Sequence, residues 1–460
     1  MKMDDTIAAI ATAPGAGGIA VIRVSGPEAE AIALRLFRTQ NGQPPVLETH
    51  HLYHGHILSP DGGVIIDEVM AALMRAPRSY TGEDVLEIHG HGGYLLPQRI
   101  LTAVLKAGAR PAEPGEFTKR AFLNNRMDLA QAEAVADMIT SRTERGLELA
   151  QAQYQGRLSG GIEKLRAELA DILALLEAAI DFVEDLDDLP EDKAIPKRLQ
   201  RVVQDLNRLA ASYGEGKIAK EGVSVVIAGR TNVGKSSLLN HFLGEQRAIV
   251  TPIPGTTRDF IEEQVRINDI IVRLTDTAGI RKTGEAVEQA GIDLVWHRVA
   301  TADAVLILLD GSEELTAEDR EIIEKLRGKP LIPVVNKADL PRILSEAEIA
   351  RILPGKVAIP ISAKYGNGLE DLKETIYRHF CQGRGDNPAP DVITHLRHKL
   401  AIEKAVFHLC EATAAAARGS SPELTAEDLR EALDALEEII GKTANDFILT
   451  RIFSSFCIGK

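Results

Sequence analysis

The spacing of apolar positions changes three times along the chain, and each change predicts a different kind of structure. Up to about residue 118, short apolar runs alternate with turn residues; GIAVIRVSG and EDVLEIHGHGG are typical of strands, and YLLPQRILTAVLKAGA is typical of a helix. From about 119 to 215, apolar residues recur every three or four positions. That spacing indicates long amphipathic helices of the kind that pack into bundles.

From about residue 222, five short and almost wholly apolar runs alternate with helical segments: VSVVIAG, IIVRLTD, AVLILLD, LIPVVN and VAIPIS. Strands of this kind are buried on both faces, as in a parallel α/β sheet. Helical spacing returns after GRGDNPAP at 383–390, which has the composition of a linker. We therefore predict a multidomain protein with an α/β domain inserted into a helical one. The expected domains are 1–118 (α+β), 119–215 (helical, first part), 216–384 (α/β) and 385–460 (helical, second part).

Composition narrows the class of protein. The chain has 460 residues, 45% of them hydrophobic and 26% charged, as in ordinary soluble proteins. No run reaches the roughly 18 apolar residues of a membrane span, and the first residues do not resemble a signal peptide, so we expect a cytoplasmic protein without a membrane role. Three distant cysteines argue against a disulfide framework. A net charge of −14 argues against broad electrostatic binding of nucleic acid, so an RNA role would need a local basic patch or a partner.

The candidate chemistry begins at residues 229–236, which read G-x-x-x-x-G-K-S between the strand VSVVIAG and the helical segment SSLLNHFLG. In that context the motif predicts a phosphate loop, whose backbone N–H groups and helix N-terminus surround phosphate oxygens. Lys235 would reach the terminal phosphates, and the Ser236 hydroxyl would bind Mg²⁺.

Three further loops follow strands in the order expected of a guanine nucleotide site. Asp276 would face the Mg²⁺ shell, and Gly279 would let its N–H approach the γ-phosphate. Asp339 in the NKAD segment could accept hydrogen bonds from guanine N1–H and its 2-amino group, which adenine lacks. The ligand is therefore expected to be GTP or GDP. The predicted nucleotide-binding residues are Asn232, Val233, Gly234, Lys235, Ser236, Ser237, Thr251, Thr256, Thr257, Asp276, Gly279, Asn336, Lys337, Asp339, Ser362, Ala363 and Lys364.

The hydrolytic machinery departs from a common pattern. Ile280 stands where many GTPases carry a water-orienting glutamine, so the enzyme is either a slow switch or uses another polar group. A cation could replace an arginine finger, with oxygen ligands from Asn232 and the stretch 251–258. Thr257 would be the second Mg²⁺ ligand.

Several stretches resemble one known family over almost the whole length: SYTGEDVLEIHGHGG, PGEFTKRAFLNNRMDLAQAEAVADMI, AGRTNVGKSSLLN, AIVTPIPGTTRD, DTAGIRKT and RIFSSFCIGK. They are similar to the MnmE (TrmE) family of tRNA-modification GTPases. The resemblance implies a K⁺-dependent GTPase that forms a homodimer through its N-terminal domain. The implied K⁺ ligands are Asn232, Thr251, Ile253 and Thr256. Glu288 matches the water-orienting carboxylate, so Glu288 and Lys235 are the expected catalytic residues.

The same resemblance implies a folate site in the N-terminal domain. A tetrahydrofolate derivative, in its 5-formyl or methylene form, would contact the positions Arg23, Glu87, Arg126 and Lys460. With the flavoprotein partner MnmG (GidA), in a heterotetramer, the family installs an aminomethyl or carboxymethylaminomethyl group on the wobble uridine of certain tRNAs. Ala16 and Arg126 depart from the residues frequent in the family, and so does the stretch TANDFILTRIF.

Two interpretations stay open from the sequence. Cys457 in the final FCIGK could be a prenylation site, a structural thiol or a substrate-facing thiol; Gly459 and the final lysine disfavour prenylation. The alternative function is a regulatory switch GTPase in ribosome assembly. The histidines near residues 50–56 and 89–91 are expected to be strand residues rather than metal ligands.

Overall fold

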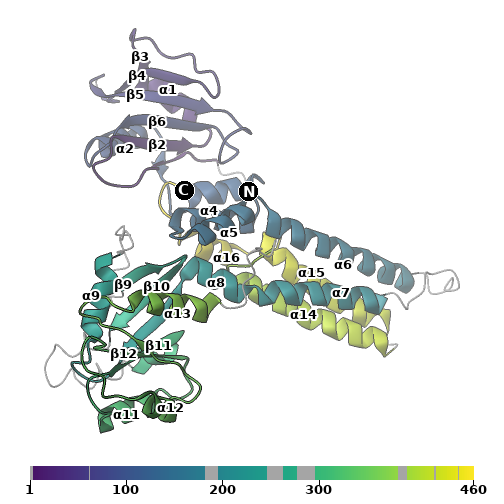
Figure 1. The fold of residues 1–460 in the computed structure, drawn as a ribbon. Helices are drawn as coiled ribbons and strands as arrows, with labels where there is room; N and C mark the ends of the chain where they lie inside the picture. The colour runs from purple at the N-terminus through teal and green to yellow at the C-terminus, as the bar shows by residue number, and fades with distance from the viewer. Residues whose placement is uncertain are drawn as a thin grey trace, which may run out of the picture. The chain divides into compact units, whose positions relative to one another are not determined.

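The computed structural model describes residues 4–61, 63–181, 195–245, 263–276, 296–381, 391–418, 421–443 and 445–460. The chain divides into two compact units. Unit 1 comprises Met1–Thr140, Ala150–Asn207 and Arg397–Lys460, and unit 2 comprises Ser141–Leu149 and Arg208–Leu396. The predicted fold class is confirmed, because an α/β unit is inserted between two parts of a unit that holds a sheet and a set of helices (Figure 1). The exact domain boundaries stay a prediction.

Unit 1 begins with a seven-stranded sheet in the order β3-β4-β5-β6-β2-β1-β7. Its neighbours pair antiparallel except β1 and β7, which are parallel. The strands are β1 (Ile7–Ile10), β2 (Ile19–Ser25), β3 (Phe37–Thr39), β4 (Leu52–Leu58), β5 (Ile65–Met74), β6 (Val85–His91) and β7 (Arg110–Pro111).

Apolar side chains alternate along the strands, and they determine which face of this sheet the helices α1 (Ala29–Leu36) and α2 (Leu96–Lys106) cover. In β2, Ile22 and Val24 are buried among the apolar residues of α1 and α2. Their neighbours in sequence point to the opposite face, because side chains alternate along a strand. At β1 that second face is covered by Phe117 of α3 (Glu116–Leu123). Arg23 and Glu87, two of the predicted folate contacts, lie on this second face.

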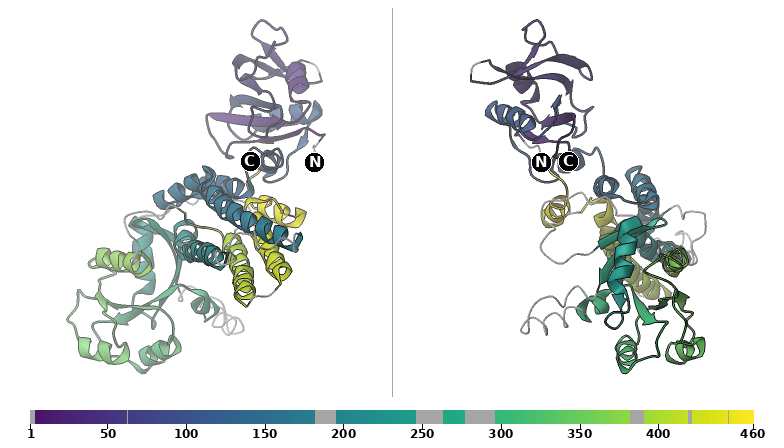
Figure 2. Two further views of the ribbon diagram at one scale, coloured as in Figure 1. Left: turned by 90° about the vertical axis from the view of Figure 1, so that its right-hand side faces the viewer. Right: turned by 60° about the vertical axis from the view of Figure 1, so that its left-hand side comes forward.

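The remaining helices of unit 1 include a bundle, as the helical spacing predicted. Figure 1 shows α6, α7, α14 and α15 running side by side, and Figure 2 shows the same grouping from two other directions. Ion pairs from Arg430 to Glu177 and from Arg166 to Glu437 join α6 to α15. The helices are α4 (Leu129–Thr140), α5 (Glu144–Tyr154), α6 (Arg157–Asp181), α7 (Ile195–Ala211), α14 (Leu396–Ala417), α15 (Pro422–Ile440) and α16 (Asp446–Phe453). The first part of α5, up to Leu149, and the end of α7, from Arg208, belong to unit 2.

Within the region of helical spacing predicted from about residue 119, α4 and α5 are separate helices. Thr143 ends the intervening turn, and its side-chain oxygen accepts a hydrogen bond from Gly146 N at 3.0 Å. A threonine that accepts from the third residue of the following helix is an N-cap, so a new helix starts here. Helical periodicity continues through such a break, which is why the apolar spacing alone does not reveal it.

Unit 2 contains a six-stranded sheet in the order β13-β12-β11-β8-β10-β9, parallel except for β9. Its strands are β8 (Val223–Ala228), β9 (Glu263–Ile267), β10 (Ile270–Asp276), β11 (Ala304–Asp310), β12 (Leu331–Asn336) and β13 (Ile359–Pro360). Its helices are α8 (Tyr213–Glu221), α9 (Lys235–Glu245), α11 (Ala317–Lys325), α12 (Glu346–Ile352) and α13 (Leu369–Cys381). The edge strand β9 mixes polar and apolar residues, so it carries no all-apolar run that would predict a buried strand.

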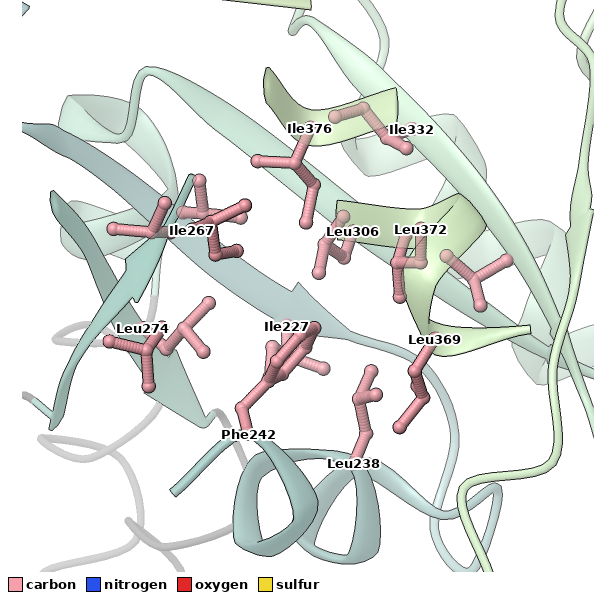
Figure 3. Close-up of a cluster of buried hydrophobic side chains, with 14 of the residues drawn as sticks. Ile227, Leu238, Phe242, Ile267, Leu274, Leu306, Ile332, Leu369, Leu372 and Ile376 are labelled. Atoms are coloured by element: carbon pink, nitrogen blue, oxygen red, sulfur yellow. The ribbon is translucent and has the colours of Figure 1, made fainter. Parts of the chain in front are cut away.

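Both faces of this second sheet are buried, as the apolar runs predicted. Figure 3 shows one face, where Ile227 and Leu306 of the sheet meet Phe242 of α9 and Leu372 of α13. The opposite face holds Val226 and neighbouring residues against the apolar side chains of the α11 and α12 region. Because both faces are filled, the carboxyl ends of the parallel strands and the loops that follow them are the places left for a polar site.

Candidate functional site

The predicted phosphate loop joins β8 to α9 as the motif requires. Gly229 and Gly234 both have left-handed backbone conformations, with φ of 150° and 104°. A Cβ on Gly229 would lie 2.6 Å from Leu308 O, and one on Gly234 would lie 2.2 Å from Asn336 Nδ2. No side chain fits at those distances, so glycine is required at both ends of the loop. Asn232 also has a left-handed φ, of 61°, which asparagine tolerates better than most residues.

Lys235 is the first residue of α9, and its side chain folds back over the loop. Its Nζ donates to Gly229 O at 2.8 Å and to Arg230 O at 2.7 Å, and the residue is 6% exposed. Ser236 and Ser237 follow in the first turn of α9. The structure therefore places Lys235 and Ser236 at the end of the loop, where Lys235 would contact the terminal phosphates and Ser236 a phosphate-bound Mg²⁺.

Asn336 connects the phosphate loop with the two predicted guanine loops. It ends β12 and is 3% exposed. Its Nδ2 donates to Val233 O at 2.7 Å, and its Oδ1 accepts from Ala363 N at 2.9 Å. One amide side chain thus supplies hydrogen-bond partners to backbone groups of two other loops. Those backbone groups need partners because they are buried. These segments lie far apart in the sequence but adjacent at the carboxyl edge of the sheet.

The residues expected to recognise guanine lie next to this bridge. Asp339 Oδ1 accepts from Ser362 Oγ at 2.6 Å, which fixes the carboxylate relative to the loop after β13. Lys337 has a left-handed φ of 65°, and its Nζ lies 2.5 Å from Asp310 Oδ2. Lys364 places its Nζ over the ring of Tyr365, 4.9 Å from the centroid. Asn336, Lys337, Asp339, Ser362, Ala363 and Lys364 are all brought together.

The predicted metal ligands are only partly described. Asp276 ends β10 and pairs in register with Ile227 of β8, so its backbone lies beside the start of the phosphate loop. Outside the described residues lie the following predicted positions: Thr251, Ile253, Thr256, Thr257, Gly279 and Glu288. Across the described part of the chain, no three His, Cys, Asp or Glu side chains converge as candidate metal ligands.

In unit 1, three of the four predicted folate contacts converge on the second face of the sheet. Arg23 Nε donates to Glu87 Oε1 at 2.9 Å, and Arg23 Nη1 donates to Gly459 O at 3.4 Å. Lys460 lies close enough to interact with both side chains. Burial lowers the pKa of Lys460, and the positive charge of Arg23 lowers it further, against the opposing effect of Glu87. The site therefore holds two cations and one carboxylate.

The final residues reach this site because Gly459 allows a close approach. Gly459 has φ of 95°, and a Cβ there would lie 2.6 Å from Ile10 O of β1. Phe456 is 7% exposed and packs among apolar residues of α3, α4 and α16. Figures 1 and 2 show the C-terminus beside the first sheet.

Arg126 and Cys457 are located by their contacts with neighbouring segments of the chain. A Cβ on Gly82 would meet Arg126 Cγ at 3.2 Å, so Arg126 lies against the segment that follows Tyr80. Cys457 is exposed, and its carbonyl accepts from Gly115 N and Lys460 N, each at 3.4 Å. Its backbone thus has a structural role, and the role of its thiol stays open.

Sequence reasoning missed three residues of this second site. His89 Nε2 lies 3.2 Å from Glu87 Oε2, so Glu87 has Arg23 on one oxygen and an imidazole on the other. Tyr80 and Phe117 lie with their ring centroids 5.2 and 5.8 Å from the Arg23 guanidinium carbon, within the range of a cation–π contact. Period-two spacing places His89 on the same face as Glu87, a signal that could have found it. Nothing local points to Phe117, which is distant in sequence.

Within the described residues, no helix combines the length and apolar character needed to cross a membrane.

Comparisons with known proteins match the chain along its length. The family described as "GTP-binding protein TrmE N-terminus" matches residues 6–126, and "MnmE helical domain" matches 129–457. A relative from Syntrophus aciditrophicus, named tRNA modification GTPase MnmE, is 51% identical over 458 residues, covering 100% of both chains. One of the same name from Geobacter sulfurreducens is 47% identical over 461 residues, again covering 100% of both. Among solved structures, Aquifex aeolicus Era bound to GDP·AlF₄⁻ is 30% identical, with coverage of 40% of this chain and 67% of that chain. The TM-score of that match is 0.29.

Proposed function

The chain belongs to the MnmE family of tRNA modification GTPases, and we propose that it is a K⁺-dependent GTP hydrolase that modifies the wobble uridine of certain tRNAs. The observation that carries the nucleotide assignment is the Asn336 bridge, which holds the phosphate loop and both guanine loops at one edge of a parallel sheet. Loops held in this way can contact the phosphates and the base of one ligand at the same time. GTP or GDP with Mg²⁺ is that ligand.

Hydrolysis would use a cation where other GTPases use an arginine finger. The proposed K⁺ ligands are Asn232, Thr251, Ile253 and Thr256, and Glu288 would orient the attacking water. Asn232 supports this assignment, because it is an exposed residue of the phosphate loop whose side chain carries an amide oxygen. Mg²⁺ would be held by Ser236 and Thr257, and Lys235 would contact the terminal phosphates.

The cation dependence is tested by measuring GTP hydrolysis by the full chain in KCl and in NaCl at equal ionic strength. We expect a rate at least tenfold higher in KCl, because replacing a transition-state charge is worth about 10³–10⁵ in rate for arginine fingers. Equal rates in the two salts, with GTP bound, would overturn the K⁺ assignment. Lack of preference for guanine over adenine nucleotides would overturn the nucleotide assignment itself.

A tetrahydrofolate derivative is the proposed ligand of the second site. Glu87 would accept hydrogen bonds from the guanidine-like edge of the pterin, and Arg23, Arg126 and Lys460 would bind carboxylate or carbonyl groups. The convergence of Arg23, Glu87 and Lys460 on one sheet face supports this assignment. Titration of the full chain with 5-formyltetrahydrofolate by calorimetry tests it. We expect Glu87→Gln to weaken binding at least tenfold while nucleotide affinity stays unchanged, and unaltered folate binding by that variant would contradict the assignment.

The proposed assembly is a homodimer that works with the flavoprotein MnmG in a heterotetramer in the cytoplasm. An aminomethyl or carboxymethylaminomethyl group on tRNA would be the product. The net charge of −14 supports a division of labour in which the partner holds much of the tRNA. Mass spectrometry of tRNA nucleosides from cells lacking this protein should show loss of these wobble groups. Deletion of residues 457–460 should also abolish modification while leaving GTP binding intact, and equal modification by the truncated chain would contradict a role for these residues.

A further inference from the structure

Asp310 occupies a position between the phosphate loop and the first guanine loop. It is the last residue of β11, the strand that lies between β8 and β12 in the sheet. Ile307 pairs with Ala228 on one side, and Asp310 itself pairs with Asn336 on the other. Its side chain is 3% exposed, so its charge must be balanced by neighbouring groups.

Each oxygen of the Asp310 carboxylate has its own set of partners. Oδ1 accepts from Ser312 N at 3.0 Å and from Ser312 Oγ at 2.7 Å. Oδ2 lies 2.5 Å from Lys337 Nζ and 3.4 Å from Arg230 Nη2. Burial acts to raise the pKa of Asp310, but the hydrogen bonds from Lys337 and Ser312 hold that pKa below its ordinary value. The carboxylate is therefore charged at neutral pH and shared by two cations.

The two cations come from different loops of the nucleotide site. Arg230 belongs to the phosphate loop, and Lys337 belongs to the guanine loop, where it directly follows Asn336. Arg230 also pairs with Glu313 and with Asp319, which closes the capping box of α11. Those two carboxylates lie on the α11 side of Arg230, and Glu313 is 54% exposed. Asp310 thus faces both Arg230 and Lys337.

We propose that Asp310 is a positioning residue of the nucleotide site, whose carboxylate couples the phosphate loop, through Arg230, to the guanine loop, through Lys337. Movement of either cation changes the balance of charge around a buried carboxylate and so changes the preferred position of the other cation. Ordering of one loop by its part of the ligand then favours the ordered form of the other. The inference rests on the proposed binding of guanine nucleotides at this site.

The experiment is a double-mutant cycle between the two loops, measured as the dissociation constant of the fluorescent nucleotide mant-GDP on the full chain with Mg²⁺. The variants are Arg230→Gln, Lys337→Met and the two together. If Asp310 couples the loops, the fold-change of the double variant should differ from the product of the single fold-changes by at least fivefold. Single fold-changes that multiply to within twofold would overturn the proposal, and this result needs no Asp310 variant that folds.

Repeating the cycle in two further backgrounds locates the coupling. In Asp310→Asn, which keeps the shape and removes the charge, the single fold-changes should multiply to within twofold. In Glu313→Gln, the matched control that also pairs with Arg230, the non-multiplicative behaviour should persist. Coupling that survives Asp310→Asn would overturn the assignment to this carboxylate. A wild-type chain that does not bind mant-GDP would refute the proposed function instead, so the two failures are distinguishable.

Discussion

The turn between β9 and β10 is predicted to stabilise the start of α5 through one carboxylate. Asp269 accepts hydrogen bonds from Glu144 N at 3.0 Å and from Arg145 N at 2.9 Å. These amides belong to the first turn of α5, where N–H groups have no partner within the helix. Asp269 therefore caps a helix whose first two residues precede it in the sequence by 125 and 124 positions.

The size of the effect follows from three contributions. Loss of a cap costs about 1 kcal/mol, and loss of a negative charge near a helix N-terminus costs roughly 0.3–1 kcal/mol. The exposed pair of Asp269 with Arg266 adds little, since surface ion pairs contribute about 0–1 kcal/mol. Asp269→Ala should therefore weaken the first turn of α5 by about 1–2 kcal/mol, which is roughly a 5–30-fold increase in local opening.

Hydrogen exchange of the full chain, read by mass spectrometry on peptides that cover residues 141–154, measures this opening directly. Exchange at Glu144 and Arg145 should rise 5–30-fold in Asp269→Ala. Gly146 should change less, because the Thr143 side chain continues to cap it.

Glu148→Gln is the matched control, since Glu148 is an exposed carboxylate that pairs only at the surface with Arg145, at 3.4 Å. It should leave exchange within twofold of the wild type. If Asp269→Ala also stays within twofold at Glu144 and Arg145, the carboxylate does not stabilise the helix and the reasoning is wrong.

Two other substitutions test the packing around the two sites, and a third tests an ion pair on α6 of the helical bundle. Asn336→Ala leaves two buried backbone groups without their partner, at a cost of about 1–3 kcal/mol each. The affinity for GDP should therefore fall at least tenfold in a fluorescence titration. Unchanged affinity would contradict the role of Asn336 in joining the loops. Gly459→Ala should weaken folate binding at least fivefold in calorimetry, because the new alanine Cβ would lie 2.6 Å from Ile10 O. Equal binding would show that the final residues can shift at no cost. A hydrogen bond from Arg166 lowers the pKa of Glu163 to about 2 from 4.5, so its stabilisation is present above pH 4.5 and is lost as the pH falls through about 2. Glu163 is 44% exposed, so Glu163→Gln should reduce the free energy of unfolding by only about 1 kcal/mol at pH 7, a difference that denaturation curves should show shrinking between pH 4.5 and 2.

The sequence determined the architecture and the chemical class of the nucleotide site. Apolar runs buried on both faces predicted the parallel sheet, and the segment 229–236 predicted the phosphate loop, because both depend on residues that are neighbours in the chain. The break between α4 and α5 escaped notice, since a cap at Thr143 leaves the helical period unchanged. The edge strand β9 also escaped, because it lacks an all-apolar run.

Only the tertiary structure decided which distant residues share a contact. Asn336 bridges Val233 and Ala363, and Asp310 faces cations from two loops, because parallel strands bring their carboxyl ends to one edge. Arg23 meets Gly459 across 436 residues, a pairing that no periodicity encodes. Local patterns fix the elements and the loops that follow them, whereas contacts between loops depend on strand order and register, which follow from how the whole chain buries its apolar surface.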